Sequence, residues 1–228
     1  MEKIIELSSD GTLAQQCYDQ LLNDIVQGVL KPGEKLKVTY LKDRLLVGQS
    51  PVREALSRLV TSGLVQMKDN KGFYVAETSE SDIRDIYQTF TQIENLALGL
   101  AMQKGDDEWQ ANIIGMLYKL SLVENQQSIS SPDVWLERNY DFHLALISGC
   151  RSATLLDIRH NLYLKFNRYC KMSYQFHLDD LSVNHQDHQE LVQEVLQGNV
   201  EKAQKLMNHH INGSLEDIIK NLKQYNLI

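Results

Sequence analysis

The segment Gln49–Leu59 reads QSPVREALSRL and carries the clearest structural signal in this chain of 228 residues. Ser50 and Pro51 are typical of a helix start, with Ser at the N-cap and Pro at the first helical position, where a missing N–H does no harm. Apolar residues then recur at helical spacing until Gly63, at Val52, Ala55, Leu56, Leu59 and Val60. The pattern predicts an amphipathic helix over 52–62 with a polar N-terminal turn.

Two more helices and a hairpin are expected around this segment. A stripe of apolar residues covers 12–27, and a short helix is expected over 39–46, just before the break at 47–49. After Gly63, two β-prone runs surround a polar turn at 68–72. Two helices joined by a short break form a helix-turn-helix, and a hairpin after them makes the winged form.

Beyond Thr78 the hairpin signals stop and only helical patterns follow. A capping-box-like start at 79–82 opens a long helix to about 103. Further helices are expected at about 107–127, 132–149, 152–178, 182–197 and 200–224. The predicted fold is mainly α, with a winged helix-turn-helix domain over 1–77 and an all-α helical bundle over 78–228.

Composition limits the class of protein. Hydrophobic residues make up 43% and charged residues 23%, which excludes wholesale disorder. No apolar run approaches the roughly 18 residues that span a bilayer, and the N-terminus lacks the apolar core of a signal peptide. The three cysteines show no C-x-x-C spacing and are interpreted as free thiols. We therefore expect a cytoplasmic protein with no membrane partner.

The net charge of -7 is divided unevenly along the chain. Residues 1–77 carry as many basic as acidic side chains, so residues 78–228 hold the whole negative excess. Within the first part, Lys31–Lys71 contains nine basic and four acidic residues. This local positive excess indicates a nucleic-acid partner for the first domain only.

Four motifs of the first domain occur in a fixed order: GVLKPGEKL at 28–36, QSPVREALSRL at 49–59, GLV at 63–65 and GFYV at 72–75. This text closely resembles the GntR family of bacterial transcription regulators. The second domain is similar to the FadR-type (FCD) helical effector domain of that family, through Asn139–His143, His188 and His210. The resemblance implies a homodimeric, ligand-responsive repressor of a metabolic operon, not an enzyme.

Several residues of the first domain are candidates for contact with operator DNA. The N-terminal turn of the 52–62 helix would enter the major groove, and the preceding helix and the wing would follow the phosphates. The candidates are Gln49, Ser50, Pro51, Arg53, Arg44, Lys42, Lys71 and Gly72. The family usually has Ser-Arg-Thr before the proline, whereas this chain has Gly48-Gln49-Ser50, and Gln favours adenine. A solvated surface charge is the alternative for each basic residue.

Four residues of the second domain form a candidate metal site. Asn139 and His143 lie one helical turn apart, on one face. His188 and His210 are equidistant from the Gly198-Asn199 turn, so an antiparallel helical hairpin would place them side by side. From the spacing alone, a purely structural role for these histidines stays open. The resemblance implies a divalent metal such as Zn or Ni, held by these four residues. Asn139 stands where the family usually has Asp, which should weaken metal binding.

Two arginines, Arg159 and Arg168, are candidates for holding the carboxylate of a small effector. Burial with pairing to a Glu is the alternative for them.

Two other functions stay open. A helical metal-dependent enzyme would need a general base, and no Glu or Asp near the histidines is obviously placed as one. A DNA-binding protein without an effector would have a filled core in its second domain.

Overall fold

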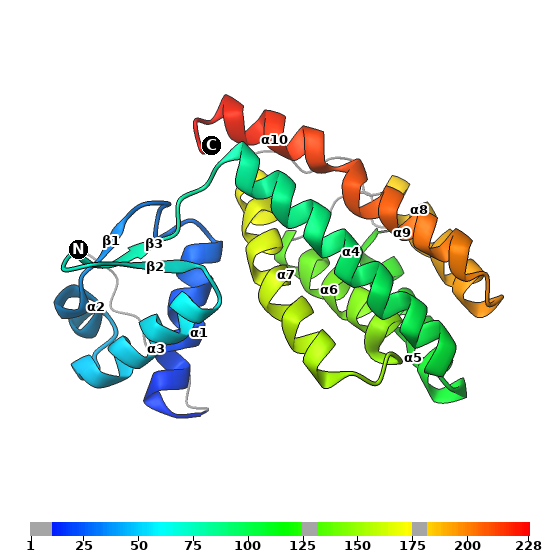
Figure 1. Ribbon diagram of the computed structural model, residues 1–228, viewed down its shortest axis with the longest axis horizontal. Coiled ribbons are helices and arrows are strands. Elements are labelled where there is room, and N and C mark those ends of the chain that lie inside the picture. The colour runs from blue at the N-terminus through cyan, green and yellow to red at the C-terminus, as the bar shows by residue number, and fades with distance from the viewer. Residues whose placement is uncertain (1–10, 125–131, 175–181) are drawn as a thin grey trace. The chain divides into compact units, whose positions relative to one another are not determined.

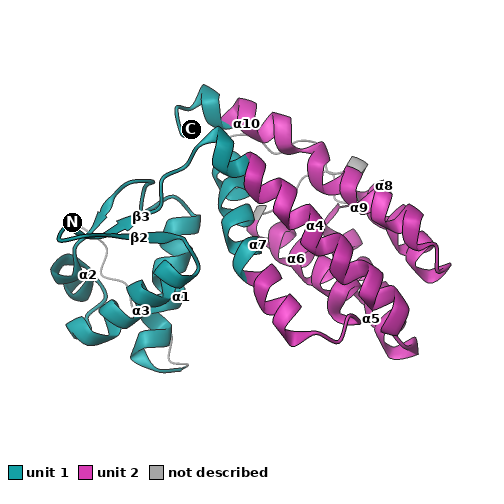
Figure 2. Cartoon of the chain, in the orientation of Figure 1, with its two compact units in different colours: residues 1–83, 161–173, 222–228 teal, residues 84–160, 174–221 magenta. Residues whose placement is uncertain are grey.

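The computed structural model describes residues 11–124, 132–174 and 182–228 (Figure 1). The chain separates into two compact units, coloured in Figure 2. Unit 1 comprises Met1–Ile83, Asn161–Ser173 and Leu222–Ile228, and unit 2 comprises Arg84–His160 and Tyr174–Asn221. Unit 1 thus includes the start of one later helix and parts of two others, and the domain boundary at 77/78 stays a prediction.

The N-terminal elements form a winged helix-turn-helix. They are α1 (Leu13–Val26), β1 (Lys35–Leu36), α2 (Val38–Arg44), α3 (Gln49–Thr61), β2 (Val65–Lys68) and β3 (Gly72–Val75). The antiparallel sheet has the order β1-β3-β2, with Val65 opposite Val75 and Lys68 opposite Gly72. The predicted hairpin is confirmed, and the two-residue strand β1 is an addition that sequence patterns did not show.

The recognition-helix candidate, α3, begins earlier than predicted. Gly48 is its N-cap and Gln49 its first residue, so the assignment of Ser50 as N-cap and Pro51 as first helical residue is wrong. Proline is tolerated here because N–H groups in the first turn of a helix have no intrahelical partner. Val52, Ala55, Leu56 and Leu59 are buried as predicted, in a core shared with α1 and β3.

All the elements of the C-terminal part are helices among its described residues. Its helices are α4 (Glu80–Lys104), α5 (Asp107–Glu124), α6 (Pro132–Ser148), α7 (Ala153–Tyr174), α8 (Ser182–Leu196), α9 (Val200–Gly213) and α10 (Leu215–Gln224). The single helix expected over 200–224 is divided at Ser214, where glycine and serine, both weak helix formers, follow each other. The ends expected near 127 and 178 lie outside the described residues.

The bundle core of unit 2 positions the candidate metal site. Helix α5 packs against α6 and α8, and α8 packs against α9. A tight turn with Gly198 at a φ of 76° joins α8 and α9, a left-handed conformation that glycine adopts without strain. This turn produces the helical hairpin that the histidine spacing predicted. Among the described residues, no helix combines the length and apolar character needed to cross a membrane.

Candidate functional sites

The exposed N-terminal turn of α3 is the candidate DNA-binding surface. Gln49, Ser50 and Arg53 are exposed, and Pro51 is half-buried. The opposite face of the helix is held in the core of the winged helix, so these polar side chains point to solvent from a rigid support. Helix N-termini also attract phosphate through their free N–H groups. Exposed polar side chains at the N-terminal turn of α3 are what a contact with the major groove requires, and the contact itself stays a prediction.

Two basic residues of α2 differ in their surroundings. Arg44 Nη2 lies 2.9 Å from Asp24 Oδ2 of α1, and the two side chains are only 12% and 4% exposed. Arg44 therefore joins α2 to α1, and its contact with a phosphate stays a prediction. Lys42 pairs with exposed Asp43, at 3.3 Å, and its side chain is 35% exposed.

The wing presents its predicted residues to solvent. Lys71 and Gly72 are both exposed, and Gly72 has a φ of 89°, so a side chain at this position would be strained. Lys35 and Lys68 approach the ring of Tyr74, with Nζ 5.7 and 4.7 Å from its centroid. The wing therefore carries positive charge on both outer strands, which suits contact with a phosphate backbone.

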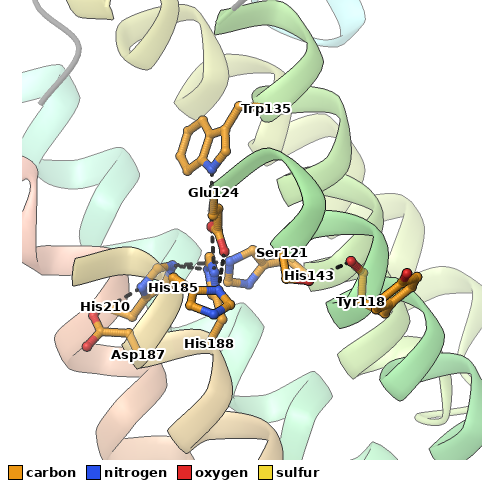
Figure 3. Close-up of polar contacts among 9 residues, drawn as sticks. All are labelled: Tyr118, Ser121, Glu124, Trp135, His143, His185, Asp187, His188 and His210. Carbon is orange, nitrogen blue, oxygen red and sulfur yellow. Dashed lines mark hydrogen bonds and ion pairs between the residues drawn. The ribbon is translucent and has the colours of Figure 1, made fainter. Parts of the chain in front are cut away.

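Three histidines from three helices converge in unit 2 (Figure 3). His143 is on α6, His188 on α8 and His210 on α9. His210 Nε2 lies 3.3 Å from Nε2 of His143 and 3.1 Å from Nε2 of His188. One ligand atom from each histidine falls within 4.8 Å of the others. Three imidazole nitrogens so arranged could hold a divalent metal ion.

Asn139 tests whether this site fits a metal. It lies one turn before His143 on α6, and its Oδ1 is buried without a hydrogen-bond partner among the described residues. A buried amide oxygen left unpaired costs about 1–3 kcal/mol, so such an atom requires an explanation. One explanation is that this oxygen would be a ligand to a cation held by the three histidines. The chemistry of the four predicted residues therefore fits a metal.

Burial keeps the histidines in the form that binds metals. Burial first, and then the neighbouring His210 and His188, hold the pKa of His143 well below its usual value. Burial and His210 lower the pKa of His188 to about 4, although Glu124 and Asp187 oppose this shift. Both rings are therefore neutral at pH 7, as metal ligation by imidazole requires.

Two carboxylates that sequence reasoning missed contact these rings. Glu124 Oε1 lies 3.0 Å from Nδ1 of His188, and Asp187 Oδ2 lies 3.4 Å from Nδ1 of His210. From the sequence, no Glu or Asp near the histidines was expected to be placed as a general base. Both carboxylates meet the Nδ1 side of the rings, away from the converging Nε2 atoms, and so are not placed as a general base would be. Burial alone would raise the pKa of Glu124, but hydrogen bonds from His188, Trp135 and His185 lower it.

His185 belongs to the same network. Its Nδ1 lies 3.1 Å from Glu124 Oε2. Trp135 donates its indole N–H to Glu124 Oε1 at 3.2 Å. The adjacency of Asp187 to His188 was the one available signal for Asp187, whereas nothing in the sequence marks Glu124.

The two candidate effector arginines do not meet. Arg159 is buried in unit 2, and its Nε donates to Glu94 Oε1 at 2.6 Å. Arg168 is buried in unit 1, and its Nη2 donates to the carbonyl of Ala76 at 2.8 Å. Nine residues of a helix turn the chain by about two and a half turns, so the two side chains leave α7 on opposite faces. Each arginine has a hydrogen-bond partner within its own unit, and contact with an effector stays a prediction for both.

Comparison with known proteins identifies the family. The model described as "Bacterial regulatory proteins, gntR family" matches residues 13–75, and the "FCD domain" model matches residues 85–213. The HTH-type transcriptional repressor GlaR of Escherichia coli (strain K12) is 35% identical over 198 residues, covering 85% of this chain and 90% of GlaR.

The chain belongs to the GntR family. Another similar relative of this GntR-family regulator is the HTH-type transcriptional regulator BphR of Paraburkholderia xenovorans (strain LB400), 33% identical over 92% of this chain and 87% of BphR. The solved structure of E. coli McbR/YncC shares its fold, with a TM-score of 0.76 over 95% of this chain and all of that chain, at 21% identity. This chain is therefore a DNA-binding transcription regulator with an effector domain, and not an enzyme.

Proposed function

We propose that this GntR-family regulator represses transcription as a homodimer and is released from its operator by a small carboxylate that binds through a metal ion in unit 2. The observation that carries the proposal is the convergence of the Nε2 atoms of three histidines, together with the unpaired Oδ1 of Asn139 one helical turn before His143. The description of the relative GlaR as a repressor supports repression.

The proposed ligands of the metal are His143, His188, His210 and Asn139. Three neutral imidazoles and an amide oxygen suit zinc or nickel better than magnesium or calcium, which prefer sets of oxygen ligands. When bound, the metal would supply Lewis-acid attraction for the effector's carboxylate. A solved relative in fold is the metal-free FCD domain of TM0439, with a TM-score of 0.53, so the bundle itself does not require a metal to be folded in that protein.

On the DNA side, Gln49, Ser50 and Arg53 are the proposed contacts at the reading turn, with Pro51 shaping that turn. Lys42, Lys71 and Gly72 are the proposed contacts to the backbone. Gln is able to pair bidentately with adenine, so we propose an adenine in each half-site opposite Gln49. A dimer would place two such turns on successive major grooves. Effector binding would change the population of the arrangement that fits both half-sites.

The DNA-binding proposal is tested with Arg53→Ala and a matched control. Arg151→Ala removes the same charge from unit 2, where Arg151 is exposed and pairs with Asp106 at 2.8 Å. Binding to labelled DNA from upstream of the protein's own gene is measured by fluorescence anisotropy. Arg53→Ala should weaken binding about 10-fold or more with a shallower salt dependence, because one cationic contact is lost. Equal affinities for the two variants would refute the proposed reading turn.

The metal and effector proposal is tested by thermal denaturation with Zn²⁺ or Ni²⁺, alone and with small carboxylates. At 100 times its Kd, a ligand stabilises the folded state by about 2.7 kcal/mol. For a chain of this size, that raises Tm by roughly 5–11 °C. His143→Ala should abolish the shift with metal, and an active carboxylate should also release the operator. A shift that survives in His143→Ala would refute the site, and no response to any metal or carboxylate would favour effector-independent DNA binding.

A further inference from the structure

Glu124 is a fully buried carboxylate at the end of α5 that accepts hydrogen bonds from three side chains (Figure 3). Oε1 receives the indole N–H of Trp135 at 3.2 Å and faces Nδ1 of His188 at 3.0 Å. Oε2 faces Nδ1 of His185 at 3.1 Å. The indole nitrogen can only donate, which places the carboxylate as the acceptor at the centre of this network.

These contacts determine which nitrogen of His188 is free. An ionised carboxylate only accepts hydrogen bonds, so the proton of the neutral ring must lie on Nδ1, facing Glu124. Nε2 then carries the lone pair, and it is Nε2 that lies 3.1 Å from His210 Nε2 in the histidine cluster. The reverse tautomer would direct an N–H into the cluster and oppose any cation there.

Charge makes the same residue important. The four candidate ligands are neutral, namely three imidazoles and the amide of Asn139. A divalent cation among them would be buried with His188, which is 0% exposed, and a buried charge without an opposite charge is costly. Among the described residues, Glu124 and Asp187 are the carboxylates that contact the three histidines. Asp187 is the weaker of the two because it is 24% exposed and 3.4 Å from its ring.

We propose that Glu124 is the positioning residue of the metal site: it holds His188 with the Nε2 lone pair facing the cation and supplies, through that ring, the buried negative charge that the neutral ligands lack. Trp135 and His185 in turn hold the carboxylate in place. The proposal rests on the proposed metal-binding function and adds to it a residue that does not touch the metal. Carboxylate partners of metal-bound imidazoles commonly change metal affinity by 10- to 100-fold.

The test uses Glu124→Gln, which keeps the shape of the side chain and removes its charge. Zn²⁺ affinity is measured on the full-length protein by competition with a chromophoric chelator. We expect the Kd to rise about 10- to 100-fold, and about 10-fold or less for Asp187→Asn. The control is Glu190→Gln on α8, which removes an exposed charge whose Oε1 accepts a hydrogen bond from Gln186 at 2.9 Å, and should leave the Kd unchanged. An unchanged Kd in folded Glu124→Gln would overturn the proposal.

A second readout does not depend on metal binding. In the metal-free protein, ¹⁵N chemical shifts of the His188 ring should show the proton on Nδ1, and in Glu124→Gln this preference should be lost or reversed. Failure of the wild-type protein to bind Zn²⁺ would refute the metal function, whereas a His188 proton on Nε2 would refute the role of Glu124 itself. If Glu124→Gln does not fold, Glu124→Asp, which keeps the charge on a shorter side chain, should bind Zn²⁺ with intermediate affinity and retain the Nδ1–H tautomer. An Nε2–H tautomer in that variant would also overturn the proposal.

Discussion

Glu94 of α4 and Arg159 of α7 form a buried ion pair in unit 2, and removing either partner alone should destabilise this unit. Arg159 Nε lies 2.6 Å from Glu94 Oε1, and the two side chains are 1% and 0% exposed, so solvent does not screen either charge. The guanidinium also lies over the rings of Phe90 and Tyr140, at 5.5 and 5.0 Å. Removing one partner of such a pair costs about 3–5 kcal/mol because the other charge stays buried.

The two single substitutions should differ. Glu94→Gln leaves a guanidinium that cannot lose its proton and should lower the free energy of unfolding by about 3–5 kcal/mol, or Tm by roughly 6–20 °C. Arg159→Met leaves Glu94, whose pKa is already raised by burial against the opposing effect of Arg159. The carboxyl can then take up a proton, so Arg159→Met should cost less, and its cost should increase as the pH rises above about 4.3, the pKa of an unfolded Glu.

The double variant Glu94→Gln/Arg159→Met completes the cycle. It leaves no buried charge at this position and should be more stable than Glu94→Gln alone. Urea denaturation followed by circular dichroism measures all four proteins, and the pH dependence of Arg159→Met is compared with that of the double variant, which lacks the carboxyl. If the two single losses simply add in the double variant, the charges are not coupled and the reasoning fails.

Three further results are expected. Arg168→Met should lower the free energy of unfolding by about 1.5–3 kcal/mol by removing a charged donor from the Ala76 carbonyl, without changing the carboxylate response; a lost response at unchanged Tm would contradict this role. Leu46, at a φ of 55° and 65% exposed, occupies a left-handed position that Asn tolerates better, so Leu46→Asn should raise stability by about 1 kcal/mol in urea titrations, and a loss would show that the side chain packs usefully. Asn139→Asp should tighten Zn²⁺ binding at least about 10-fold by calorimetry, because it adds a charge in direct contact with the cation; weaker binding would exclude Asn139 as a ligand.

The winged helix was predictable because its signals are local. The apolar spacing of α3, the turn residues around Gly72 and the break at 47–49 each act within a few residues. Strand β1 was missed because two residues carry no periodicity, and its existence depends on β3 lying alongside. The ion pair of Arg44 was not predicted because its partner, Asp24, lies on another helix. The structure differs from expectation wherever a side chain is defined by a distant partner.

The metal site shows the same division within one constellation. Local periodicity predicted that Asn139 and His143 share a face of α6, and the symmetry of a helical hairpin predicted that His188 and His210 lie side by side; the structure brings the three histidines together. Only the resemblance to the FCD domain joined all four residues into one proposed metal site. Glu124 is 64 residues from His188, and only the packing of α5 on α8 brings its carboxylate to Nδ1. Long-range packing in the folded protein decides which nitrogen of a histidine ring is unprotonated and which arginine has an ion-pair partner. Local patterns of the sequence indicated which histidines come together, whereas their protonation and charge balance depend on tertiary structure, because electrostatic interactions depend on distance in space and not on separation along the chain.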